Sequence, residues 1–306
     1  SAHAGAAPWL MLGASLLFAT MGVCVKLAAE QYGAGEIVLY RGLVGMVIVG
    51  ATMLARGRSL RTPVPRMHLW RSVSGVTALT LWFFAIAGLP LATAMTLNYL
   101  SPVWMAAFLL AAGWLGRSER VDPRLVWPVL AGFAGVVMLL QPSFAGAQAA
   151  AALAGLASGM LAALAYLQVA ALARAGEPAD RIVFYFSLGG VLAGALAATL
   201  VGQWHAHTWR GALLLLAVGV LASLAQLMLT RAYAVGRTLS NAALQYLGIV
   251  FATLYGVLLF DEVLAPVAWA GMVLAAAAGI VSTRLRERTG ASVAGAALTG
   301  GARARE

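Results

Sequence analysis

The chain has 306 residues, of which 62% are hydrophobic and only 10% are charged, and its formal net charge is +10. Ordinary soluble domains carry about 25% charged residues, so this composition excludes that class and indicates a membrane protein. A positive net charge is also typical of nucleic-acid-binding proteins. Most arginines here border hydrophobic stretches, however, where membrane orientation favours them. We therefore expect the lipid bilayer, and no nucleic acid, as a partner.

Ten apolar stretches follow one another along the chain. A transmembrane helix needs about 20 residues to cross the hydrocarbon core, and each stretch is close to that length. In chain order they are 8–27, 36–54, 69–88, 91–112, 124–140, 150–170, 181–201, 210–229, 238–259 and 265–283. The loops are short and leave no room for a soluble catalytic domain. The sequence thus predicts an all-α membrane protein with ten transmembrane helices.

The distribution of positive charge predicts the orientation. With the N-terminus inside, 17 of the 20 Lys and Arg residues lie in inner loops or in the tail, and only Lys26 and Arg210 lie outside. Arg41 is left out because it lies about one turn into the second span, and Arg71 is counted with the inner set. Since cytoplasmic loops concentrate Lys and Arg, we predict that both termini are cytoplasmic. The Gly/Ala-rich segment 286–306 is predicted to be a disordered cytoplasmic tail.

The two halves of the chain resemble each other. The matching segments are TAMTLNYLSPVW (93–104) with SNAALQYLGIVF (240–251), and EIVLY (36–40) with RIVFY (181–185). Each half has five spans, and because five is odd, the second half must enter the membrane from the opposite side. We predict a five-plus-five inverted-topology repeat, with halves at 1–145 and 146–285. Such repeats are typical of secondary transporters, whose substrate sites lie at the repeat interface. A duplicated scaffold without transport activity is the alternative.

Several motifs together carry a resemblance to a known family. They are LLFATMGVCVK (16–26), VLYRG (38–42), FFAIAGLPLATAMTLNYLSPVW (83–104), TRAYAVG (230–236) and QYLGIVFATLYGVLLFDE (245–262). In this order the chain resembles the EamA-type members of the drug/metabolite transporter superfamily. The resemblance implies a ten-helix carrier with alternating access in a bacterial-type inner membrane, as a monomer or homodimer without a cofactor. The most similar subgroup includes carriers for amino acids, S-adenosylmethionine and riboflavin.

The ten acidic residues all lie in loops, at span edges or in the tail. Small exporters of cationic drugs need a carboxylate in mid-membrane to hold the drug and exchange it for protons. The sequence therefore disfavours that mechanism, although a multidrug or toxic-compound exporter remains the alternative function.

Two cations lie within the spans, Lys26 in the first and Arg41 in the second. An arginine at this depth suits a carboxylate-bearing substrate, because a guanidinium binds carboxylates with two parallel hydrogen bonds. The alternative for Arg41 is a structural ion pair with Glu36 or Glu262. Lys26 can instead extend its charge to the membrane interface. We predict Arg41 as a substrate-binding residue, and Lys26 and Glu262 as gate or structural charges.

Polar and aromatic residues inside the spans complete the predicted site. Asn98 and Gln245 occupy equivalent positions in the two halves, and Asn241 shares a helix face with Gln245. Amides in hydrocarbon need partners, so they bind either a ligand or a neighbouring helix. The predicted substrate-binding residues are Asn98, Tyr99, Trp82, Asn241, Gln245, Tyr246, Arg41 and Tyr166.

Glycine and tryptophan patterns predict packing and anchoring. The pairs Gly155/Gly159 and Gly190/Gly194 are spaced as in GxxxG motifs, which allow close helix packing. The tryptophans at span ends, which we interpret as anchors at the membrane interface, are Trp9, Trp70, Trp204, Trp209 and Trp269.

Other function classes have little support. The four histidines (His3, His68, His205 and His207) lie in termini or loops, so we predict no catalytic residue and no metal site. The His205 and His207 pair is interpreted as part of a solvated outer loop. No phosphate-binding G-x-x-x-x-G-K-[ST] motif occurs, and a channel would need polar residues along a pore. A secondary-active transporter of a zwitterionic or anionic metabolite is the leading hypothesis, with an intramembrane enzyme or channel less favoured.

Overall fold

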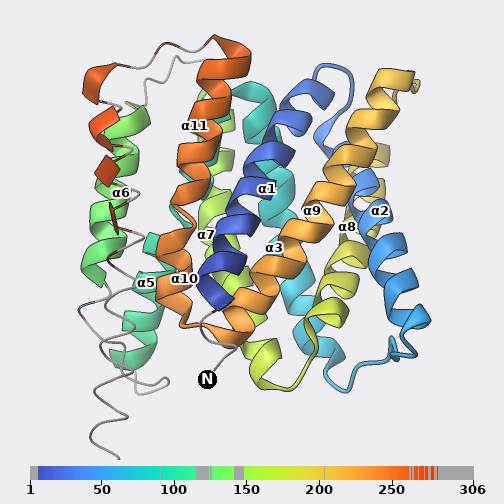
Figure 1. The fold of residues 1–306 in the computed structure, drawn as a ribbon. Coiled ribbons are helices and arrows are strands. Elements are labelled where there is room, and N and C mark those ends of the chain that lie inside the picture. The colour runs from blue at the N-terminus through green and yellow to red at the C-terminus, as the bar shows by residue number, and fades with distance from the viewer. Residues whose placement is uncertain are drawn as a thin grey trace, which may run out of the picture.

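The computed structural model describes residues 6–89, 91–114, 124, 126–140, 148–202, 204–261 and separate residues between 263 and 281. Every element of regular structure assigned within these ranges is a helix (Figure 1). The helices are α1 (Ala7–Ala28), α2 (Ala34–Ala55), α3 (Pro65–Gly88), α4 (Leu91–Asn98), α5 (Ser101–Trp114), α6 (Val126–Leu140), α7 (Ala149–Arg174), α8 (Ala179–Val201), α9 (Trp209–Val235), α10 (Thr238–Leu244) and α11 (Leu247–Phe260). The all-α prediction is thereby confirmed for the described residues.

Seven segments among the described residues are long and apolar enough to cross a membrane: α1, α2, α3, α7, α8, α9 and Ser240–Phe260. The last segment joins α10 and α11. The predicted tenth span lies only partly within the described residues, and Glu262 and the predicted tail lie outside them. The chain is therefore a multi-pass helical membrane protein, and its total of ten spans stays a prediction.

Two of the predicted spans are interrupted, and the interruptions lie at equivalent places. The fourth span breaks at Tyr99 and Leu100, between α4 and α5, and the ninth breaks at Gln245 and Tyr246, between α10 and α11. In the first break, Pro102 has no N–H to donate to the carbonyl of residue 98, so the helix ends there. Each break leaves backbone and side-chain polar groups in the middle of an apolar span.

The long helices pack side by side in one bundle (Figure 1). α2 packs against α8, α3 against α7, α1 against α9, and α4 against α11. Glycine makes the α2–α8 contact close: a Cβ on Gly42 would lie 2.7 Å from the backbone N of Val191, and one on Gly194 would lie 2.7 Å from the Cα of Leu39. A Cβ on Gly190 would lie 3.6 Å from the Cα of Gly42. Both glycines of the Gly190/Gly194 motif therefore face another helix, as predicted.

Candidate functional site

A cavity that is partly open to solvent lies among the long helices, and its atom-free space, with that open part included, is about 650 Å³. Its lining comes from α1, α2, α3, α7, α8 and α9, and from the two helix breaks. The polar lining residues are Ser15, Arg41, Arg71, Asn98, Gln226 and Gln245. A mostly apolar lining with a few polar groups is typical of small-molecule sites.

Six of the eight predicted substrate-binding residues line this cavity: Arg41, Trp82, Asn98, Tyr99, Tyr166 and Gln245. The two amides also bind neighbouring helices. Asn98 Nδ2 donates to Ser158 Oγ at 3.0 Å, and Gln245 Nε2 donates to Tyr233 OH at 2.7 Å. Their nitrogen atoms thus hold helices together, as the alternative interpretation of these amides expects, while their side chains border the cavity. Ligand binding by the six residues stays a prediction.

Asn241 and Tyr246 do not appear in the cavity lining. Asn241 Nδ2 donates to Ala232 O at 2.6 Å, close to the end of α9. Tyr246 OH donates to Val129 O of α6 at 3.0 Å, and its side chain is fully buried. Both side chains therefore support the packing around α10. Of the two amides predicted to share a helix face, only Gln245 lines the cavity, whereas Asn241 bonds to the end of α9.

Arg71 is a cavity residue that the sequence analysis assigned to the inner loops. Its side chain is 2% exposed, and that of Arg41 is 3% exposed. Both guanidinium groups lie over the ring of Phe186, with Cζ at 4.0 Å from the ring centroid for Arg71 and 4.8 Å for Arg41. Such cation–π contacts favour a desolvated cation. Arg71 was missed because the predicted span began at 69, whereas α3 begins at Pro65.

Neither cavity arginine forms an ion pair with a carboxylate within the described residues. The expected Arg41–Glu36 pair is absent there because Glu36 has another partner. Its carboxylate accepts from His205 N at 2.9 Å and lies 2.6 Å from His205 Nδ1. The predicted pairing of Arg41 with Glu262 stays untested, because Glu262 lies outside the described residues.

Lys26 lies away from the cavity and caps a helix. Its Nζ donates to Leu89 O at 2.6 Å and to Ile86 O at 3.0 Å, at the end of α3. Backbone carbonyls at a helix C-terminus lack helical partners and carry partial negative charge, so a cation there is stabilising. These contacts support the structural role predicted for Lys26.

A polar cluster joins the start of α2 to the connection between α8 and α9. We call Glu36, Tyr40, His205 and His207 the α8–α9 cluster. His205 contacts Glu36, and Tyr40 OH lies 2.7 Å from His207 Nε2. Glu36 is fully buried, whereas the two histidines are exposed. The interpretation of these histidines as merely solvated was therefore incomplete, since both hold the connection against α2.

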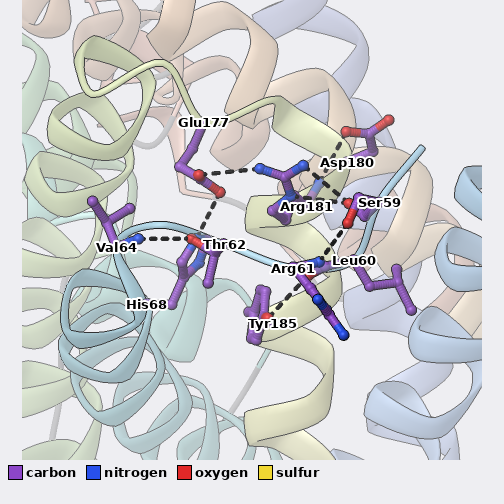
Figure 2. Close-up of polar contacts among 10 residues, drawn as sticks. All are labelled: Ser59, Leu60, Arg61, Thr62, Val64, His68, Glu177, Asp180, Arg181 and Tyr185. Carbon is purple, nitrogen blue, oxygen red and sulfur yellow. Dashed lines mark hydrogen bonds and ion pairs between the residues drawn. The ribbon is translucent and has the colours of Figure 1, made fainter.

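A second polar cluster joins the α2–α3 connection to the start of α8 (Figure 2). We call Ser59, Leu60, His68, Glu177, Arg181 and Tyr185 the α2–α3 cluster. His68 Nε2 lies 2.9 Å from Glu177 Oε2, and both side chains are 2% exposed. Arg181 donates to Glu177 Oε1 at 3.2 Å and to Ser59 O at 3.0 Å. The placement of His68 in a loop was wrong, because α3 begins three residues before it.

Comparison with known proteins places the chain in a family. The model of the EamA-like transporter family matches residues 6–141. The chain is 33% identical to the pseudopaline exporter CntI of Pseudomonas aeruginosa over 278 residues, which are 90% of this chain and 94% of that protein. It is 29% identical to the riboflavin transporter of Rhizobium johnstonii, over 74% of this chain and 72% of that one.

More distant proteins share the architecture. Human solute carrier family 35 member G1 is 23% identical over 89% of this chain and 77% of its own length. A solved crystal structure aligns with 93% of this chain and 99% of its own, with a TM-score of 0.75 and 22% identity. The fold is therefore shared with an experimental structure over nearly its full length. From the family match and the near-complete coverage of the 33% identical relative, the chain belongs to the EamA-like transporter family.

Proposed function

We propose that this chain is a secondary-active carrier that moves a small organic metabolite across a bacterial-type inner membrane by alternating access between two inverted five-helix halves. The observation that carries the proposal is the composition of the cavity wall. Both halves contribute to it, and the contributing segments are the first four spans of each half. A site shared between repeats is the arrangement on which alternating access depends.

The cavity residues come in repeat-related pairs, which supports the inverted repeat. The offset that aligns Asn98 with Gln245 also aligns other lining residues with each other. The pairs are Ser15 with Ala162, Phe18 with Ala165, Leu79 with Gln226, and Trp82 with Leu229. One pseudo-two-fold axis through the cavity accounts for this correspondence.

Helix packing has the same symmetry. Exchange of the two halves converts α1 into α7, α2 into α8, and α3 into α9. The contact of α2 with α8 then maps onto itself, and the contact of α1 with α9 maps onto that of α7 with α3. The halves at 1–145 and 146–285 account for these pairings without further assumptions.

The two polar clusters are the proposed gates. Tyr40 and Tyr185 are equivalent in the repeat, and each bonds to a connection in the opposite half: Tyr40 to His207, and Tyr185 to Leu60 O at 3.0 Å. With both termini cytoplasmic, the α8–α9 cluster closes the outer end and the α2–α3 cluster closes the inner end. Alternating access requires the contacts of each cluster to break while those of the other cluster remain formed.

Export is the direction we favour, because the relative with 33% identity is an exporter of pseudopaline. A multidrug exporter of lipophilic cations is the second candidate. The cavity wall opposes it, because the charged residues that line it are Arg41 and Arg71, and both are cationic. A cationic drug would meet like charge there, which is unfavourable at low dielectric.

Cross-linking tests the gating. Cys24 is the only cysteine, so a Cys24→Ala background leaves the protein without thiols. The test places paired cysteines at Tyr40 and His207, or at Tyr185 and Leu60, and joins each pair with a reducible bifunctional thiol reagent. We expect each cross-link to stop saturable flux in proteoliposomes supplied with amino acids, S-adenosylmethionine, riboflavin or pseudopaline. Reduction should restore it. Each single-cysteine variant treated alike is the control.

Two outcomes would contradict the proposal. Flux that rises linearly with substrate concentration would indicate a channel, and flux that continues through both cross-links would exclude the clusters as gates. Reporter fusions after residue 145 and after residue 306 test the topology separately, because five spans lie between them. We expect them to report opposite compartments, and the same compartment for both would refute the inverted repeat.

A further inference from the structure

The cavity wall combines buried positive charge with an absence of nearby negative charge. Arg41 and Arg71 are almost fully buried, and no acidic residue of the chain lies in the middle of a span. A buried charge without a counter-charge is costly. The two guanidinium groups therefore require a counter-charge that no carboxylate among the described residues supplies.

The hydrogen-bonding groups of the wall show the same imbalance. Among the described residues, five buried nitrogen atoms of the lining lack a partner, and all of them are donors. They are Arg41 Nε, Arg71 Nε, Arg71 Nη1, Trp82 Nε1 and Gln226 Nε2. Among the described lining residues, no buried acceptor atom lacks a hydrogen-bond partner. Because buried polar groups are normally paired, the wall matches a ligand that only accepts hydrogen bonds, and an ionised carboxylate is such a group.

The position of Arg71 depends on a glycine one turn along α3. A Cβ on Gly75 would collide with Arg71 Nη1 and would lie 3.0 Å from Cε2 of Phe186. The missing side chain at Gly75 thus allows the guanidinium to lie against the helix beside the ring. Since both arginine Cζ atoms lie within 5 Å of that ring's centroid, they are at most about 9 Å apart. Two acidic groups joined by a short carbon chain can each contact one guanidinium group at such a separation.

We propose that the cavity binds an organic anion with at least two carboxylate groups, one held by Arg41 and the other by Arg71, with Trp82 and Gln226 as further donors. This inference rests on the proposed function, because it assigns the substrate class of the same cavity. It also assigns specificity to Arg71 and Gly75, which set the distance between the two acidic groups.

The test uses the purified full-length protein in detergent with dicarboxylates from malonate to adipate, citrate, and the corresponding diamides. Thermal stabilisation and titration calorimetry give the dissociation constants. We expect at least one dicarboxylate to bind, and its diamide to bind at least tenfold more weakly. Charge-assisted hydrogen bonds set the expected loss for Arg41→Gln and for Arg71→Gln at about ten- to a hundredfold.

Two variants separate binding from folding. Gly75→Ala retains both arginines but displaces Arg71, so it should weaken dicarboxylate binding as Arg71→Gln does. Arg66→Gln removes an exposed arginine from the same helix and should leave binding unchanged. Without ligand, Arg71→Gln should melt no lower than the wild type, because it removes an uncompensated charge. An arginine that supports the fold would instead lower the melting temperature when replaced.

The outcomes distinguish this inference from the transport proposal. Equal affinity for dicarboxylates and diamides, or no stabilisation by any dicarboxylate in the panel, would overturn the anion site. Saturable, cross-link-sensitive flux of an uncharged metabolite in the same preparation would leave the carrier intact while excluding the dicarboxylate class. Loss of melting stability on replacing Arg71 would also overturn the assignment.

Discussion

Replacement of Gly194 by alanine is expected to destabilise the protein, although alanine favours helices. Gly194 lies where α8 meets the backbone of α2. A Cβ there would collide with Leu39 N, would lie 2.7 Å from Leu39 Cα and would lie 2.9 Å from Gly35 O. These are backbone atoms, which cannot rotate away as a side chain does. Accommodation therefore requires α2 and α8 to move apart along their whole contact.

The magnitude follows from two opposing effects. Overpacking a well-packed contact costs about 1–3 kcal/mol, whereas glycine to alanine in a helix gains up to about 1 kcal/mol. Because the clash is with backbone, we expect the first effect to dominate, with a net loss of about 1–2 kcal/mol. Gly13→Ala is the matched control. Its Cβ would meet the terminal methyl of Met228, which can rotate, so we expect no loss.

The assay is thermal unfolding of both variants in the same detergent, followed by tryptophan fluorescence and by recovery of monodisperse protein. Gly194→Ala should melt several degrees below the wild type, and Gly13→Ala at or above it. Equal melting temperatures for the two variants would refute the reasoning. They would mean that α2 and α8 separate easily, and the Arg41–Phe186 contact across this seam would then not be fixed.

Four further predictions concern single side chains. Asn98→Ala should weaken ligand binding in calorimetry with near-normal expression, whereas Asn241→Ala should lower the melting temperature without changing ligand affinity. Lys26→Met should destabilise the protein by about 1–3 kcal/mol in thermal unfolding, because it leaves two buried carbonyls at the end of α3 unpaired. Glu177→Gln should increase thiol labelling of a cysteine placed at Ser59, because it weakens the bonds of His68 and Arg181.

The positions of the spans were predictable because membrane solvation dictates them. A helix in lipid needs an unbroken apolar length, and α1, α2, α3, α7, α8 and α9 each meet this requirement. The shared location of Asn98 and Gln245 at the cavity was readable as well, because the segments that carry them resemble each other in sequence. The break within the fourth span has a sequence signal in Pro102, which can interrupt a helix. The break within the ninth span was not predicted, since hydropathy averages over a span and does not register where its hydrogen bonds stop.

The rotation of each helix about its axis was not predictable from charge. Arg66 and Arg71 lie near the same end of α3, and both fit the positive-inside rule. Arg66 is exposed, whereas Arg71 turns into the cavity. The distinguishing signals were Pro65, which is favoured in the first turn of a helix and so places Arg71 well inside α3, and Gly75 one turn later.

At one pair of aligned positions in the cavity, the two halves carry residues of different charge. Alignment of EIVLY with RIVFY places Arg41 opposite Phe186 in the repeat, and these two side chains contact each other. A strictly duplicated chain would carry arginine at both positions and, with Arg71, three cations around one point. Because the second half carries Phe186 there, a third cation and its repulsion are avoided, and both guanidinium groups face the ring of Phe186. The proposed inverted repeat thus accounts for a cavity lined by both halves, and its unequal residues account for the charge selectivity proposed for that cavity.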